Sequence, residues 1–264
     1  MQISGLMRNV LWLGFFAAIL AAWWVTYHMA VRLDLIMSGQ PVSASGAGSI
    51  FAPLLHLHSP VPAFWPLFSM WSIMMAAMML PTLIPSLRTY DSLMASANGT
   101  PGGWAGIVAG YLAVWIGGAA LFTGLQLALI DSGVVDVLGA ARSPVYAAGF
   151  LIVAGLFQFS VVKDACQSVC MHPMTYFMSG WRTGTAGGVR MGLGLGAYCV
   201  GCCWAIMALG FVGGVMSLLW MGLATVFMVL EKLPQIGRYI TKPTGFILIL
   251  MGCGLLVVQG FTGG

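Results

Sequence analysis

Long apolar runs separated by short polar or glycine-rich stretches dominate the chain. No charged residue, for example, occurs between Met191 and Leu230. A helix needs about 20 apolar residues to cross the hydrocarbon core of a bilayer. On this length the pattern predicts seven helices, at residues 9–31, 62–86, 104–130, 145–163, 190–210, 212–230 and 243–261. We therefore expect an all-α fold, a polytopic transmembrane helical bundle of about seven spans.

Composition supports a membrane protein. The 264 residues are 60% hydrophobic and only 6% charged, and the mean hydropathy is +0.97. Soluble domains carry about 25% charged residues. The expected surroundings are therefore membrane lipid, and nothing in the chain indicates nucleic acid. The pattern is compatible with a homo-oligomer and does not fix the oligomeric state.

Lysine and arginine positions predict the orientation, because cytoplasmic loops carry an excess of these residues. With a cytoplasmic N-terminus, the basic residues on the cytoplasmic side are Arg8, Arg88, Lys163, Arg182, Arg190, Lys232, Arg238 and Lys242. Only Arg32 and Arg142 then lie outside. We expect an N-in, C-out chain forming a single transmembrane domain over residues 1–264, with an extracytoplasmic loop at 32–61 and a cytoplasmic loop at 164–189.

The stretch AYCVGCCWAIMALG, residues 197–210, places three thiols in an apolar run. Residues four apart lie on one face of a helix, which aligns Cys199, Cys203 and Met207. Cys202 follows Cys199 by three residues and lies about 60° away around the helix. The spacing predicts sulfur ligands that converge near the middle of the membrane.

Two further groups offer soft ligands. In MMAAMMLP, residues 74–81, Met74 and Met78 share one helix face and Met75 and Met79 share another. Cys166 and Cys170 are also four apart, in KDACQSVCMHP at residues 163–173, where His172 follows them. A pair of histidines, His56 and His58, stands in the predicted outer loop, where an ordinary exposed pair is the simpler interpretation.

Charge and softness favour copper as the ion for such sulfurs. A bare thiolate is costly in the membrane interior, whereas one thiolate, neutral thioethers and Cu(I) together carry no net charge. Thiolate and thioether are also the ligands that select Cu(I). Zinc prefers cysteine and histidine, and His28 is the single histidine in a predicted span, so zinc is disfavoured.

Two other interpretations of the cysteines stay open at this stage. Cysteine is often buried as a small apolar residue, and methionine commonly fills gaps in helix packing. The Cys-x-x-Cys spacing at Cys199 and Cys202 also allows thiol redox chemistry. Such catalysts usually expose their reactive thiol, so an enzyme is the less favoured alternative. Glu231 and Lys232 end the sixth predicted span, where a local ion pair or a contact with the helix end would account for both.

These segments together resemble a bacterial family of metal-binding integral membrane proteins, known as domain of unknown function 2182. The resemblance covers roughly residues 62–258, and its most specific element is YCVGCCWAIM at 198–207. The positions that match are Met78, Met79, Pro81, Gln158, Lys163, Cys166, Cys170, Cys199, Cys202, Cys203, Met207, Glu231 and Lys232. The family usually has Arg-Ser before the proline after the second cysteine, whereas this chain has Met171 and His172.

The resemblance implies metal binding through these cysteines in a multi-pass protein of the bacterial inner (cytoplasmic) membrane. The favoured function is a protein of copper homeostasis that holds or transfers Cu(I), exchanging it with a copper chaperone or a membrane enzyme complex. Its candidate ligands are Cys199, Cys202, Cys203, Met207, Cys166, Cys170, Met74, Met75, Met78, Met79 and His172. The alternatives are a non-catalytic accessory subunit of a copper-dependent membrane complex, or a membrane thiol-disulfide oxidoreductase.

Overall fold

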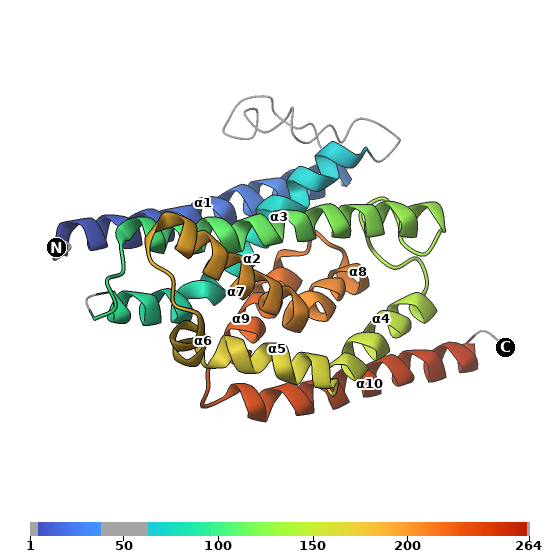
Figure 1. The fold of residues 1–264 in the computed structure, drawn as a ribbon. Helices are drawn as coiled ribbons and strands as arrows, with labels where there is room; N and C mark the ends of the chain where they lie inside the picture. The colour runs from blue at the N-terminus through green and yellow to red at the C-terminus, as the bar shows by residue number, and fades with distance from the viewer. Residues whose placement is uncertain (1–4, 38–62, 95, 263–264) are drawn as a thin grey trace.

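The computed structural model describes residues 5–37, 63–94 and 96–262, and within these ranges every regular element is a helix (Figure 1). The helices are α1 (Gly5–Met37), α2 (Phe64–Leu93), α3 (Pro101–Asp131), α4 (Pro144–Phe157), α5 (Val161–Met171), α6 (Pro173–Gly180), α7 (Gly184–Ala208), α8 (Gly210–Gly213), α9 (Leu218–Glu231) and α10 (Gly237–Thr262). The all-α prediction is therefore confirmed.

Five helical segments in the described ranges are long and apolar enough to cross a membrane, namely Gly5–Leu33, Phe64–Leu93, Pro101–Asp131, Gly184–Gly213 and Tyr239–Phe261. The pair α4 and α5 makes a sixth if it counts as one span, although its two halves are bent by 64°. The helix at the predicted span 212–230 is α9, which has 14 residues. This is shorter than the about 20 residues that a span requires, so seven spans stay a prediction.

The predicted helix at 145–163 is interrupted where a polar residue offers a new start. α4 ends at Phe157, and the Ser160 hydroxyl then accepts a hydrogen bond from the Lys163 amide at 3.1 Å. A serine at this position satisfies one of the free amides at a helix start. The predicted cytoplasmic loop at 164–189 accordingly contains most of α5, all of α6 and the first turn of α7. Residues 38–62, with His56 and His58, lie outside the described residues.

Helices α3 and α7 pack closely because glycines face each other along their contact. A Cβ atom on Gly188 would collide with the Gly103 carbonyl oxygen, and one on Gly192 would collide with the Ile107 carbonyl oxygen. Small residues spaced four apart let helix backbones approach in this way. The close contact fixes the height of α7 relative to α3, which matters because both helices contribute to the site described below.

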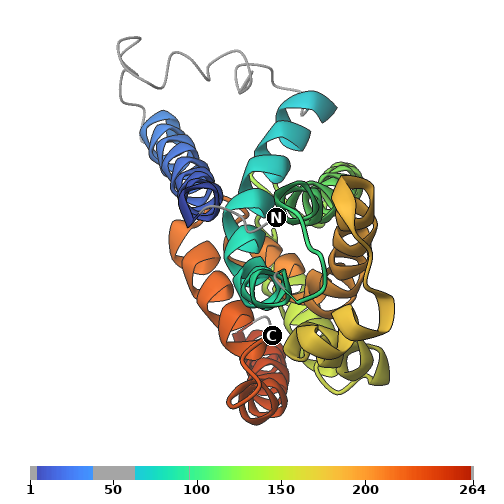
Figure 2. The same cartoon turned by 60° about the vertical axis from the view of Figure 1, so that its left-hand side comes forward.

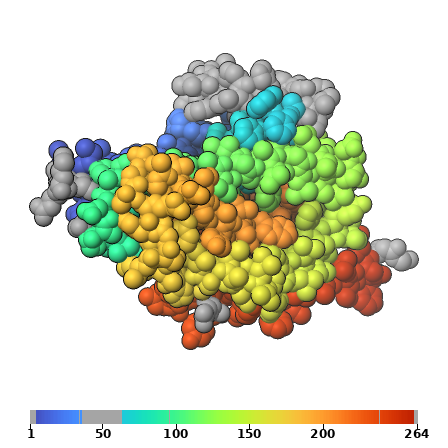
Figure 3. Space-filling view, in the orientation of Figure 1, coloured from blue at the N-terminus to red at the C-terminus, as the bar shows by residue number. Residues whose placement is uncertain are grey.

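α7 packs against α3 and α5 with one face and exposes Tyr198 and Trp204 on another. α1 and α10 lie at opposite edges in both ribbon views (Figures 1 and 2), and both carry many exposed apolar side chains. The space-filling view shows α3 in green, α5 in yellow and α7 in orange covering one face (Figure 3). The cysteines of α7 are consequently enclosed by protein on several sides.

Candidate metal centre

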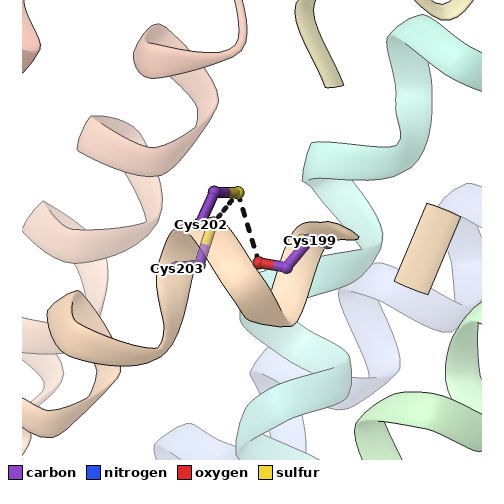
Figure 4. Close-up of side chains that lie close together, drawn as sticks. All are labelled: Cys199, Cys202 and Cys203. Carbon is purple, nitrogen blue, oxygen red and sulfur yellow. Dashed lines mark hydrogen bonds between the residues drawn. The ribbon is translucent and has the colours of Figure 1, made fainter. Parts of the chain in front are cut away.

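Three cysteines of α7 lie close together, and Figure 4 shows the contacts of Cys202 Sγ with Cys203 Sγ and with the Cys199 carbonyl oxygen. The Sγ atoms of Cys199, Cys202 and Cys203 all lie within 4.8 Å of one another, and all three residues are buried. The Cys202 and Cys203 sulfurs are 3.3 Å apart, and the Cys202 thiol donates to the Cys199 carbonyl oxygen at 3.2 Å. Two metal–sulfur bonds of about 2.3 Å span about 4.6 Å end to end. Small side-chain rotations therefore suffice to bring these three residues, the thiol cluster, onto one ion.

A fourth thiol reaches the cluster from α5. Cys170 is buried and lies close enough to Cys202 for their side chains to interact. It also shares a small cavity with Cys199. Cys166, one turn earlier on α5, packs instead against α7 at Gly201 and is partly exposed. The structure thus brings Cys170 to the thiol cluster and leaves Cys166 outside it.

Two polar side chains from other helices contact the Cys199 sulfur. The Lys232 ammonium, directly after α9, donates to Cys199 Sγ at 2.9 Å. The Tyr111 hydroxyl, from α3, lies 3.0 Å from the same sulfur and also donates to the Met79 carbonyl oxygen. Lys232 is buried and has no carboxylate within salt-bridge distance among the described residues. A fixed positive charge therefore faces a sulfur that can become a thiolate.

A second buried lysine is neutralised by its own partner. Lys163 on α5 forms an ion pair with Glu231 at 3.0 Å, with 0% and 4% of the two side chains exposed. Its ammonium also donates to the Cys202 carbonyl oxygen at 3.2 Å. Gln167 donates to the Glu231 carbonyl oxygen, and the Thr241 hydroxyl donates to the Glu231 carboxylate. This network ties α5, α7, α9 and α10 together beside the thiol cluster.

The predicted methionine ligands divide into two groups. Met74, Met78 and Met207 line a cavity between α2, α7, α9 and α10, and no cysteine belongs to its lining. Met75 and Met79 are fully buried elsewhere on α2, and the Met75 sulfur faces Gly118 on α3. Met74, Met78 and Met207 therefore share a cavity that the cysteines do not line, and a common site of thioethers and thiols stays a prediction.

The histidines of the described residues lie away from the thiol cluster. His172 is exposed, and its Nδ1 lies 3.0 Å from the Ser168 carbonyl oxygen of its own helix. His28 on α1 packs edge-on against Trp24 and Tyr27. The set of ligands that converges in the described part of the chain thus consists of sulfur, which favours a soft ion.

The sequence did not single out Tyr111, and it suggested Glu231 as the partner of Lys232. Adjacent helical residues do not face each other, which is why Glu231 pairs with Lys163 and leaves Lys232 to Cys199. The available signal was that Glu231 and Lys232 are neighbours in sequence. Neighbouring helical residues point in different directions, so each of the two needs a partner from elsewhere in the fold. Tyr111 carries no such signal, since tyrosine is common in apolar helices.

Fold and centre together define a helical protein that encloses a cluster of soft, sulfur-bearing ligands beside a positive charge. A family model described as a copper chaperone, PpoB2, matches residues 68–255. The chain belongs to this family. The match supports the copper-related, metal-binding part of the assignment made from sequence, while domain of unknown function 2182 stays a resemblance. No curated protein and no solved structure matches the chain.

Proposed function

We propose that the protein is a membrane-embedded copper chaperone that binds Cu(I) at the thiol cluster and passes it to a copper-dependent partner. The observation that carries this proposal is the convergence of three buried Sγ atoms within 4.8 Å of one another. The copper-chaperone family model, which spans residues 68–255, supports the identity of the cargo. Transfer by ligand exchange would keep the ion between soft donors throughout.

The charges near the thiol cluster support tight binding of a monovalent ion. Cu(I) and Lys232 together carry two positive charges, which two thiolates balance. The remaining thiol and Cys170 then serve as neutral neighbours or as further ligands. A divalent ion would need all three cysteines of the cluster as thiolates for the same neutrality, and each buried thiolate adds a desolvation cost. The smaller number of buried thiolates and the copper-chaperone family model favour Cu(I) over Zn(II).

Membrane insertion and orientation are part of the proposal. The five long apolar helices support insertion, and the excess of basic residues in one set of loops supports an N-in, C-out chain in the bacterial inner membrane. In this orientation Lys163, Cys170 and Lys232 lie toward the cytoplasm. The thiol cluster would then receive copper from the cytoplasmic side, where thiols stay reduced.

Copper stoichiometry in the purified protein tests the proposal. The protein is loaded with Cu(I) anaerobically in detergent, dialysed against a Cu(I)-specific chelator and measured for copper and protein. We expect the wild type to retain copper and the variant C199S/C202S/C203S to lose it. The matched control is C166S/C253S, which removes the partly exposed Cys166 and the exposed Cys253 of α10, both outside the thiol cluster, and should retain the wild-type amount. Equal copper content in wild type and the triple variant would refute the proposed site.

Transfer is tested separately in cells. A deletion strain that expresses the wild type should restore the activity of copper-dependent membrane enzymes, whereas C199S/C202S/C203S should not. Thiol trapping of the same cells distinguishes an oxidoreductase. Cysteines that cycle between thiol and disulfide during turnover would favour that alternative, and a chaperone keeps them reduced.

A further inference from the structure

A second sulfur-lined site lies one helical turn from the thiol cluster. It is a cavity of about 160 Å³ between α2, α7, α9 and α10. Four methionines line it, Met74 and Met78 from α2, Met207 from α7 and Met221 from α9, and we call it the methionine cavity. Met221 was not among the residues singled out from the sequence, because only the fold brings α9 to this place.

The thioether sulfurs are the metal-ligating side-chain atoms that this cavity offers. The Thr244 hydroxyl already donates to the Ile240 carbonyl oxygen at 2.8 Å. The Trp71 indole N–H donates to Gln126 at 2.7 Å, and an indole N–H cannot accept a metal in any case. The remaining lining is aliphatic and aromatic. Hard cations that prefer oxygen would find no replacement for their hydration shell here, whereas Cu(I) accepts thioethers.

We propose that the methionine cavity is a second Cu(I) site, distinct from the thiol cluster and weaker than it. The choice of Cu(I) as its cargo rests on the proposed function. Four thioethers are neutral, so the ion keeps its full positive charge in an apolar cavity. Trp71 and Phe227 also line the cavity, and a cation over the face of either ring would gain cation–π attraction that offsets part of that cost. A site of this kind binds reversibly, in contrast to one with thiolates.

The two sites are connected through α7. Met207 follows Cys203 by four residues, so both side chains lie on one face of the helix and are about 6 Å apart along its axis. Both residues are buried. Met207, a candidate ligand of the methionine cavity, therefore lies one turn after Cys203 of the thiol cluster. No water-exposed residue lies between them on that face of the helix.

Selenomethionine labelling gives a direct test in the full-length protein. The labelled protein in detergent receives first one and then two equivalents of Cu(I), supplied as its acetonitrile complex, and X-ray absorption is recorded at the copper edge. We expect sulfur scattering alone with the first equivalent and copper–selenium scattering with the second. Absence of copper–selenium scattering at two equivalents would overturn the second site and leave the thiol cluster unaffected. Selenium scattering already with the first equivalent would contradict the order of affinities.

Matched variants locate the second ion. M74L/M78L removes two ligands on the cavity side of α2, and M75L/M79L removes two buried methionines of the same helix outside the cavity. Leucine and methionine have similar volumes, so both variants should fold, which the unfolding temperature checks. We expect M74L/M78L to lower the affinity for the second equivalent of Cu(I) by about tenfold or more. M75L/M79L should leave this affinity unchanged. Equal weakening in both variants, or in neither, would overturn the proposal, and M207L/M221L repeats the test from the other helices.

Discussion

The thiol cluster and the methionine cavity both present sulfur inside the bundle, but their surroundings differ in charge. Lys232 and Tyr111 contact a cluster sulfur, and the Lys163–Glu231 pair lies beside it. The methionine cavity is lined by apolar side chains and one threonine whose hydroxyl is already used. Thiolates need compensating charge and thioethers do not. If both places bind Cu(I) as proposed, the comparison predicts that neighbouring charge, more than the number of sulfurs, determines how strongly each retains the ion.

The largest effect is expected from breaking the buried ion pair. Glu231→Gln leaves Lys163 charged and unpaired in the interior, which costs about 3–5 kcal/mol of stability. We expect a marked fall in the unfolding temperature measured by tryptophan fluorescence in detergent. The matched control is Asp164→Asn, which removes the carboxylate of the exposed pair with Lys242 and should cost about 1 kcal/mol or less. A loss of similar size in both variants would contradict a special role for the buried pair.

Removing the positive charge at the sulfur should weaken copper binding at one site only. Lys232→Met leaves the copper-loaded site with a buried thiolate that lacks its compensating charge, which costs several kcal/mol, so the affinity for the first equivalent should fall by about 10-fold or more. Competition with a chromophoric Cu(I) chelator measures it. The second equivalent should bind as in the wild type. Lys242→Met, whose charge is exposed, serves as control, and an unchanged first affinity in Lys232→Met would refute the charge argument.

A smaller effect is expected at the other contact of the same sulfur. Tyr111→Phe keeps the ring and removes the hydroxyl that lies 3.0 Å from Cys199 Sγ. A neutral hydrogen bond contributes about 0.5–1.5 kcal/mol, which predicts a loss of about 2- to 10-fold in the first affinity by the same competition assay. Tyr146→Phe, at an exposed tyrosine of α4, should change nothing. A loss as large as that of Lys232→Met would mean that charge is not the deciding difference.

The smallest effect on copper affinity is expected at the cysteines of α5, where Cys170 and Cys166 should differ. Cys170→Ser removes the thiol next to Cys202 and should weaken the first equivalent measurably. Cys166→Ser, one turn away, should leave both equivalents within experimental error of the wild type. Copper titration of the two variants in parallel checks this. The opposite order would place the outer cysteine, rather than the inner one, at the thiol cluster.

Much of the fold could be predicted because long apolar helices are recognisable from their length and hydropathy. The spacing of three and four residues likewise predicts that Cys199, Cys202 and Cys203 meet, and they do. The break between α4 and α5 was missed because apolar residues continue on both sides of Ser160, so the hydropathy pattern shows no interruption. The length of α9 was overestimated for a related reason, since the glycine-rich turn before it is itself apolar.

Contacts between residues of different helices could not be predicted from the sequence, for a different reason. A helix pattern tells which residues share a face, but it does not tell which helix covers that face. Met207 was therefore grouped with the cysteines on its own helix, and only the fold shows that it also lines a cavity together with residues of α2 and α9. Cys170 could be recognised as a candidate but not assigned to the cluster, because its approach depends on the 64° bend that follows α4.

The helix that follows this bend, α5, makes several of the contacts described above from one of its faces. Lys163, Gln167 and Cys170 are spaced by four and three residues, so they form a single stripe along the short helix α5. The stripe reaches a carbonyl of α7, the end of α9 and a thiol of the cluster. Any displacement of α5 against its neighbours must disturb all three together. Because these contacts lie on one face of a short helix, a displacement of α5 would change the surroundings of the innermost sulfurs.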